Sequence, residues 1–419
     1  LHLCDRRQRQ MCIRDRSYCE PYDRGPMEEL QIGSRVDGVM GEFWNGLSAI
    51  FQNNLMMRRT TKLASSIAHI NGQKVVGAEA YTSEPESGRW QEYPFALKAV
   101  GDKAFTEGIN RMVIHRYAMQ PHPDAAPAMT LGPWGIHFDR TNTWWEPGRA
   151  WIDYLNRCQT LLQEGLFVAD FAYFTGDNIV GYTKVHRRDL NPVPPEGYDY
   201  DLMNTETLLN RAWVERGRLR LPDGMNYRVL VLQEQSHITL GLLRKLRNMV
   251  EQGLIIVGAR PQQTVGLQSY SVIEEKEFEQ LCDELWGKAA TTVVDRSVGK
   301  GRIFWETSLN LEQVLEKIQL RPDFEVITDS ISAPIRYIHR QIGEADVYFV
   351  ANQQRTSKEL ICNFRVKGKI PEFWNPISGE RTRAMVYQTN EETISVPVQL
   401  EAYGSVFVVF RSDLPEQKA

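Results

Sequence analysis

The 419-residue sequence lacks several patterns that would point directly to a class of protein. No stretch approaches the roughly 18 uninterrupted apolar residues that a membrane-spanning helix needs. The six cysteines are scattered without CxxC spacing, so neither a zinc site nor a disulfide framework is indicated. A net charge of −4 gives no electrostatic reason to expect binding to nucleic acid or to an anionic membrane surface.

The motifs of several enzyme classes are also missing. There is no HExxH, no GxSxG elbow, and no phosphate-binding GxGxxG or GxxxxGKS/T. The sequence instead has 10 Trp and 16 Tyr, many of them in the first third beside acids and histidines. Aromatic rings stack on the C–H faces of sugars and carboxylates bind their hydroxyls, so this combination favours a carbohydrate ligand, although any single Trp is more often a core residue.

Residues 1–16 differ from the rest of the chain. They are basic, contain two cysteines, and show neither helical nor strand periodicity. They also lack the apolar segment of a signal peptide. We interpret them as a non-native segment from read-through or sequence assembly, and expect the protein proper to begin part-way through a domain near Ser17.

Residues 17–164 alternate between short apolar runs and stretches with helical spacing. The apolar runs repeatedly end in polar residues, namely Glu20, Glu42, Glu79 and His115. Strand–helix units with polar side chains at the carboxyl ends of the strands are typical of a parallel (β/α) TIM-type barrel. Because only four such units can be traced, we expect the C-terminal half of a barrel.

A loop rich in Pro, Gly and aromatic residues, 120–148, closes this part of the chain. Loops of this length are usually functional or disordered. His137, Trp144 and Trp145 argue against disorder, so we expect a wall or lid of a substrate site, with a packing loop as the alternative.

Two further regions follow. Residues 165–300 contain buried strand patterns separated by an amphipathic helix, which predicts a small open α/β sheet with a structural or oligomerising role. Residues 301–419 alternate apolar and polar positions between turn signals, which predicts an antiparallel β-sandwich. A scaffold role is expected for the sandwich, with sugar binding as the alternative.

Glu42 and Glu79 are the best candidates for chemistry. They lie about one barrel repeat apart, so neighbouring strands would present them on the same rim. Hydrolysis of a glycosidic bond needs such a pair, one group to protonate the leaving oxygen and one to activate water or attack carbon. A single Glu after a strand would more often be a cap or an ion-pair partner, but three in succession beside aromatic residues favour a sugar-cleaving site.

Several motifs carry a resemblance to glycoside hydrolase family 106: EPYDRGP, GVMGEFW, VGAEAYTS, WGIHFDRTNTWW and PEFWNPISGE. The resemblance implies a calcium-assisted α-L-rhamnosidase that inverts the anomeric configuration and acts on rhamnose-containing oligo- or polysaccharides. It also implies a fold of class α/β plus β, with the barrel followed by a flavodoxin-like (Rossmann-like) domain and a β-sandwich. Such enzymes are commonly exported, so a periplasmic or secreted location is expected.

The resemblance also implies roles for single residues. Glu79 is the candidate general base, and Glu42 is either catalytic or a ligand of Ca²⁺ or of a sugar hydroxyl. The family pattern has a further strand-end Glu well upstream, in a region that this chain lacks, and that residue is the expected general acid. The substrate-binding candidates are Glu20, Trp44, His115, His137, Trp144 and Trp145. A retaining β-galactosidase-like enzyme and a non-catalytic carbohydrate-binding or scaffold protein remain the alternatives.

Overall fold

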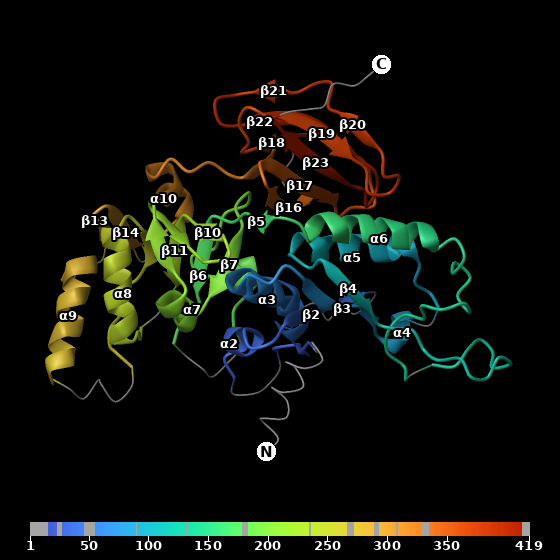
Figure 1. Ribbon diagram of the computed structural model, residues 1–419, viewed down its shortest axis with the longest axis horizontal. Coiled ribbons are helices and arrows are strands. Elements are labelled where there is room, and N and C mark those ends of the chain that lie inside the picture. Colours follow the sequence, from blue (N-terminus) through green and yellow to red (C-terminus); the bar gives the residue numbers. More distant parts are fainter. Residues whose placement is uncertain are drawn as a thin grey trace.

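The structure is a computed structural model, and it describes residues 16–22, 27–45, 55–88, 90–130, 132–177, 183–233, 236–265, 272–288, 293–306, 309–327 and 335–412. The segment interpreted as non-native falls almost entirely outside these ranges. Within them, no helix is long and apolar enough to cross a membrane. Figure 1 shows three groups of elements along the chain, coloured blue to teal, green to orange, and orange to red.

The first group is built on a parallel sheet whose four strands pair in sequence order, β1-β2-β3-β4. The strands are β1 (Tyr18–Cys19), β2 (Gly38–Asn45), β3 (Val76–Ser83) and β4 (Arg111–Ile114). The helices are α2 (Glu29–Gly33), α3 (Leu55–Asn71), α4 (Pro85–Gly88), α5 (Pro94–Thr106) and α6 (Arg149–Leu162). Strands and helices therefore alternate here, as the sequence pattern indicated, but β4 is shorter than the apolar run that contains it.

The two faces of this sheet differ because successive side chains of a strand point to opposite sides. Val39 and Phe43 of β2 and Ala78 of β3 are buried in the main core. On the other face, Met40 is half-buried and Val113 is 47% exposed. This open face holds an apolar hollow of about 240 Å³. The polar side chains described below lie on the same face, toward the carboxyl ends of the strands.

The second group is a six-stranded mixed sheet of order β13-β14-β12-β11-β6-β7, in which only the pair β13–β14 is antiparallel. Its strands are β6 (Phe171–Phe174), β7 (Tyr200–Met203), β11 (Val229–Gln233), β12 (Ile255–Gly258), β13 (Val293–Val298) and β14 (Gly301–Glu306). The helices with it are α7 (Thr205–Asn210), α8 (Leu240–Glu251), α9 (Val272–Trp286), α10 (Leu311–Lys317) and the short η3 (Arg187–Asp189). A small antiparallel sheet of β8 (Trp213–Glu215), β9 (Arg218–Arg220) and β10 (Asn226–Tyr227) adjoins them.

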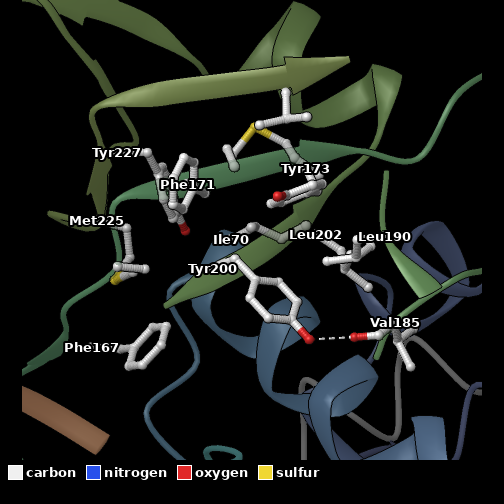
Figure 2. Close-up of a cluster of buried hydrophobic side chains, with 14 of the residues drawn as sticks. Ile70, Phe167, Phe171, Tyr173, Val185, Leu190, Tyr200, Leu202, Met225 and Tyr227 are labelled. Atoms are coloured by element: carbon white, nitrogen blue, oxygen red, sulfur yellow. Dashed lines mark hydrogen bonds between the residues drawn. The ribbon is translucent and has the colours of Figure 1, made fainter. Parts of the chain in front are cut away.

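The core of the second group is rich in aromatic residues. Figure 2 shows the side chains of β6 and β7 packed together, with the Tyr200 hydroxyl donating to the Val185 carbonyl at 2.6 Å. The expected boundary at residue 300 lies inside the β13–β14 hairpin, because β14 pairs with both β12 and β13. The sheet therefore continues to Glu306.

The third group consists of two antiparallel sheets with orders β15-β18-β22-β21 and β20-β19-β23-β17-β16-β5. The strands are β5 (Leu166–Phe167), β15 (Phe324–Ile327), β16 (Ile335–Ile342), β17 (Ala345–Asn352), β18 (Lys358–Phe364), β19 (Ile370–Trp374), β20 (Arg381–Arg383), β21 (Gln388–Thr389), β22 (Ile394–Leu400) and β23 (Ser405–Arg411). Side chains of both sheets, including Tyr348 and Phe364, share one core cluster. Strand β5 pairs with β16, so the chain contributes to this sheet before it enters the second group.

Helix α3 joins the first two groups. It contacts both β2 and β7, and all its residues from Thr60 to Ile70 are buried. Lys62 Nζ lies 2.8 Å from Asp199 Oδ1, and His69 Nδ1 lies 2.9 Å from Asp201 Oδ1. A buried helix with charged side chains is stable only where those charges are paired, as they are here.

A second buried polar cluster joins the last two groups. Arg365 bridges Asp170, which precedes β6, and Asp323, which precedes β15, at 2.9 and 3.3 Å. The His339 ring contacts Asp323 at 3.0 Å through Nδ1 and Asp346 at 3.1 Å through Nε2. Burial alone would lower the pKa of His339, but the charges and hydrogen bonds of the two aspartates outweigh it and raise the pKa to about 9.

Candidate active site

Glu42 and Glu79 lie directly opposite each other in the parallel pair β2–β3. Neighbouring strands are about 4.8 Å apart, so the two carboxylates start from adjacent points on the open face. Both residues are half-buried, which leaves them accessible while limiting their hydration. Glu42 and Glu79, which were chosen because they lie about one barrel repeat apart in the sequence, are thus neighbours in the sheet.

The Glu42 carboxylate is held by two donors. The Tyr22 hydroxyl donates to Oε2 at 2.5 Å, and the Trp44 indole Nε1 donates to Oε1. Burial, together with the charge of Glu42, raises the pKa of Tyr22 well above its usual value, so this hydroxyl stays protonated and acts as a donor. These bonds direct Glu42 toward the side of the sheet formed by β1.

The Glu79 carboxylate is held on the opposite flank. The Thr82 hydroxyl donates to Oε1, and His115 Nδ1 lies 3.7 Å from the same oxygen. His115 follows β4 directly, and its backbone N–H donates to the Ala80 carbonyl at 2.9 Å, which fixes its place beside β3. Glu79 is therefore held by a donor of its own strand and by the first residue after β4, whereas Glu42 is held by a donor of its own strand and by Tyr22 after β1.

Glu20 provides a third carboxylate, one residue after β1. Its side chain is exposed, but partial loss of hydration raises its pKa. The Tyr22 hydroxyl opposes this shift, while the like charges of Glu79 and Glu42 add to it. The charges of Glu42 on β2 and Glu79 on β3 therefore reach Glu20 beside β1.

The loop 120–148 contributes an aromatic wall. Trp134 is 44% exposed and meets the Trp44 ring edge-on, with 5.8 Å between ring centroids. Backbone bonds hold the loop against the rim, since Gly135 N–H donates to the Ser83 carbonyl at 2.7 Å and Ile136 N–H to the His115 carbonyl at 3.0 Å. An exposed indole therefore stands beside the Glu42 end of the site.

The other aromatic candidates of the loop lie deeper. His137 is 6% exposed and stacks on Trp90 with 3.7 Å between centroids. Trp144 packs edge-on against Trp151, and Trp145 is half-buried against Phe138. His137 therefore supports the loop from within, whereas Trp144 and Trp145 are half-buried like Trp44, and Trp134 is the exposed indole beside them.

Three functional candidates escaped the sequence analysis: Tyr22, Thr82 and Glu92. Tyr22 and Thr82 lie two or three residues beyond strand-end glutamates, so the signal for them was their place in the motifs. Glu92 is 6% exposed in the connection between α4 and α5 and accepts hydrogen bonds from Asn45 and Ser83. Burial raises its pKa to about 7, and the two hydrogen bonds lower it in part.

Glu42 is the residue at which the family resemblance places a possible calcium ligand. Within the described ranges, no group of three or more His, Cys, Asp or Glu side chains converges so as to hold a metal ion. Calcium takes about six to eight oxygen ligands. Glu42 could supply one of them, but both of its oxygens already accept hydrogen bonds from Tyr22 and Trp44.

Comparisons with known proteins agree with a carbohydrate-active site. Residues 7–389 match the sequence profile of a family described as alpha-L-rhamnosidase. A protein of Formosa agariphila, whose name gives beta-glucuronidase as a provisional activity, is 37% identical over 399 residues, covering 95% of this chain and 31% of that protein. The match to the family begins at residue 7, inside the segment interpreted from the sequence as non-native.

Solved structures show the same relationship. A rhamnosidase from Novosphingobium sp. PP1Y superposes with a TM-score of 0.84 and 31% identity, covering 96% of this chain and 38% of that chain. The family 42 beta-galactosidase Gan42B from G. stearothermophilus has a TM-score of 0.58 and 11% identity over 96% of this chain and 65% of that one, a likeness of fold alone. The chain spans about a third of the length of the two relatives with the higher identity.

Proposed function

The chain belongs to glycoside hydrolase family 106, the alpha-L-rhamnosidases, and from this premise we propose that it forms part of the active site of an α-L-rhamnosidase acting on rhamnose-containing oligo- or polysaccharides. The observation that carries the proposal is the alignment of Glu42 and Glu79 on adjacent strands, beside the exposed indole of Trp134. A sugar ring can stack on such an indole while its hydroxyls bind the carboxylates.

In the proposed mechanism Glu79 is the general base. Its carboxylate accepts a proton from the attacking water, and the nearby His115 and Thr82 orient it. Glu42 is the second carboxylate of the site, either as a proton donor or as a ligand of a sugar hydroxyl. His115, Glu20 and Trp44 surround the same space and are the proposed contacts for the sugar.

Single displacement with inversion is the proposed stereochemistry. Inverting enzymes keep their two carboxyl groups about 6.5–9.5 Å apart to admit water, whereas retaining enzymes hold them about 5 Å apart. Glu42 bonds to Tyr22 on the β1 side, and Glu79 lies against His115 on the β4 side. The two carboxylates thus have separate partners, and the inverting stereochemistry itself is taken from the family resemblance.

Two finer features complete the proposal. The four parallel strands are the C-terminal half of a (β/α) barrel, the second group of elements is flavodoxin-like, and the third is a β-sandwich. Calcium assistance, with Glu42 as the candidate ligand, follows from the family resemblance.

The test is hydrolysis of an aryl α-L-rhamnoside. The chain spans about a third of the length of its relatives, so the assay uses a protein extended to that length. In that protein we expect turnover with NMR signals of the inverted anomer first, and a loss of about 100-fold or more in kcat for Glu79→Gln, since general-base catalysis contributes roughly 10²- to 10⁴-fold. Glu359→Gln, the same change at an exposed position of β18, is the control and should leave turnover unchanged. Wild-type turnover in Glu79→Gln would contradict the assignment of the base.

The name of the Formosa relative and the fold of the galactosidase supply the alternatives for the same assay. Preferential cleavage of an aryl β-D-glucuronide or β-D-galactoside, or retention of configuration, would replace the rhamnosidase proposal. Binding of L-rhamnose without turnover, measured by saturation-transfer NMR, would favour a carbohydrate-binding role. The assay therefore distinguishes a rhamnosidase from a glucuronidase, from a galactosidase-like enzyme and from a carbohydrate-binding protein.

A further inference from the structure

Glu92 closes the ends of the two strands that carry the candidate carboxylates. Its Oε1 accepts a hydrogen bond from Asn45 Nδ2 at 2.7 Å, and its Oε2 accepts one from Ser83 Oγ at 3.1 Å. Asn45 and Ser83 are the last residues of β2 and β3 and face each other in the pairing register. One buried carboxyl group therefore links both strand ends.

The residues just before these two partners are the donors of the active site. Trp44, which precedes Asn45, donates to Glu42, and Thr82, which precedes Ser83, donates to Glu79. The β2–β3 register shifts between Phe43 and Trp44, so the pairs beyond this irregularity no longer follow from the regular ladder. These pairs are still part of the ladder, and the Glu92 carboxyl group adds a side-chain link between the last pair, Asn45 and Ser83.

The same residue also contacts the aromatic loop. The Trp144 indole Nε1 donates to the Glu92 backbone carbonyl at 2.7 Å. Ser83, bound to the Glu92 side chain, accepts at its own carbonyl from Gly135 of the loop at 2.7 Å. Strand ends and loop therefore meet at Glu92, beneath the surface that a ligand would touch.

We propose that Glu92 is a positioning residue, which sets the separation of Glu42 and Glu79 by holding Asn45 and Ser83, and through them Trp44 and Thr82. The inference rests on the proposed function, because the separation of Glu42 and Glu79 matters only if both act on one glycosidic bond. Glu92 is not itself a proton donor to a substrate, since it is buried and both of its oxygens are occupied. Its effect passes through the two donors.

The chemistry of the contact explains why a carboxylate suits this position. A carboxylate accepts at both oxygens, whereas a protonated carboxyl group donates at one of them, so that the bond with Ser83 must reverse. Burial raises the pKa of Glu92 to about 7, and the two neutral partners, Ser83 and Asn45, lower it in part. The linkage between the strands should therefore change as the pH passes through about 7.

The test compares the whole chain with its Glu92→Gln variant, which keeps the volume of the side chain and at least one hydrogen bond but cannot ionise. We would label the tryptophans with 5-fluorotryptophan, assign the Trp44 signal with Trp44→Phe, and record ¹⁹F NMR spectra against pH. The expected result is a Trp44 signal that moves through about pH 7 in the wild type and does not in Glu92→Gln. A variant signal that follows the wild-type curve would overturn the proposal.

Kinetics on the aryl rhamnoside give a second readout. Misplacement of catalytic groups by about 1 Å can cost on the order of 100-fold, so we expect kcat to fall about 10- to 100-fold in Glu92→Gln with KM changed less than about twofold. The pH dependence of kcat should also lose its limb near pH 7, while Glu359→Gln keeps it. An unchanged kcat and pH profile would count against positioning. If the wild type shows no turnover, the proposed function fails, but the NMR titration still decides the role of Glu92.

Discussion

The buried imidazolium of His339 should give this protein a stability that falls with rising pH. Raising its pKa from 6.5 to about 9 corresponds, at about 1.4 kcal/mol per pH unit, to roughly 3 kcal/mol of folding free energy. A group whose pKa is higher in the folded state stabilises fully below its unfolded pKa. The contribution of His339 is therefore complete below pH 6.5 and disappears as the pH rises through about 9.

The perturbation is His339→Gln, which keeps a polar side chain but removes the titration. Asp323 retains Arg365, and Asp346 retains Lys369 at 2.5 Å, so the variant should fold. We expect it to lose roughly 3 kcal/mol at pH 6 and to approach the wild type at high pH. Urea unfolding followed by fluorescence at a series of pH values measures the loss at pH 6 and the convergence of the two proteins at high pH.

The control is His122→Gln, at an exposed position of the aromatic loop, which should reproduce the wild-type curve. If wild type and His339→Gln lose stability in parallel between pH 6.5 and 9, the reasoning about His339 is refuted. A wild-type free energy of unfolding that stays constant over this range would refute it as well.

Two other predictions concern pairing of charges. Lys62→Met should lower the free energy of unfolding by about 3–5 kcal/mol, because it removes the cation that lies 2.8 Å from the buried Asp199. Urea unfolding against the exposed control Lys367→Met measures this loss, and a loss equal to that of the control would contradict the prediction. Calcium should raise the melting temperature of the wild type, whereas Glu42→Gln should abolish the rise; an equal rise in both proteins would remove Glu42 as the candidate ligand.

Local patterns predicted much of the first group of elements. The apolar runs that end in Glu42 and Glu79 predicted the strands β2 and β3, because this signal comes from neighbours in the sequence. The alignment of Glu42 with Glu79 could be anticipated because parallel strands present equivalent ends at one edge. The apolar run that ends in His115 was expected to be a strand, and β4 ends one residue earlier, at Ile114, where the chain begins to bond with the loop.

Contacts between distant parts of the chain could not be predicted in this way. Glu92 lies 47 residues from Asn45, and no periodicity connects the two. His137 and Trp144 were recognised by composition, but composition does not tell which side of a loop faces the core. The boundary expected at residue 300 differs from the structure for a similar reason. Strand β14 pairs with β12, which is distant in the sequence, and this pairing brings the β13–β14 hairpin into the second sheet.

The buried helix α3 has a consequence for how this protein can be divided. A helix that packs one face on a sheet can be detached with that sheet, but α3 contacts β2 on one side and β7 on the other. Cutting the chain near Glu164, where the first group ends in sequence, would leave Lys62 and His69 facing water without Asp199 and Asp201. The two sheets should therefore unfold in a single cooperative transition, and recombination between relatives should preserve them together as one inherited block.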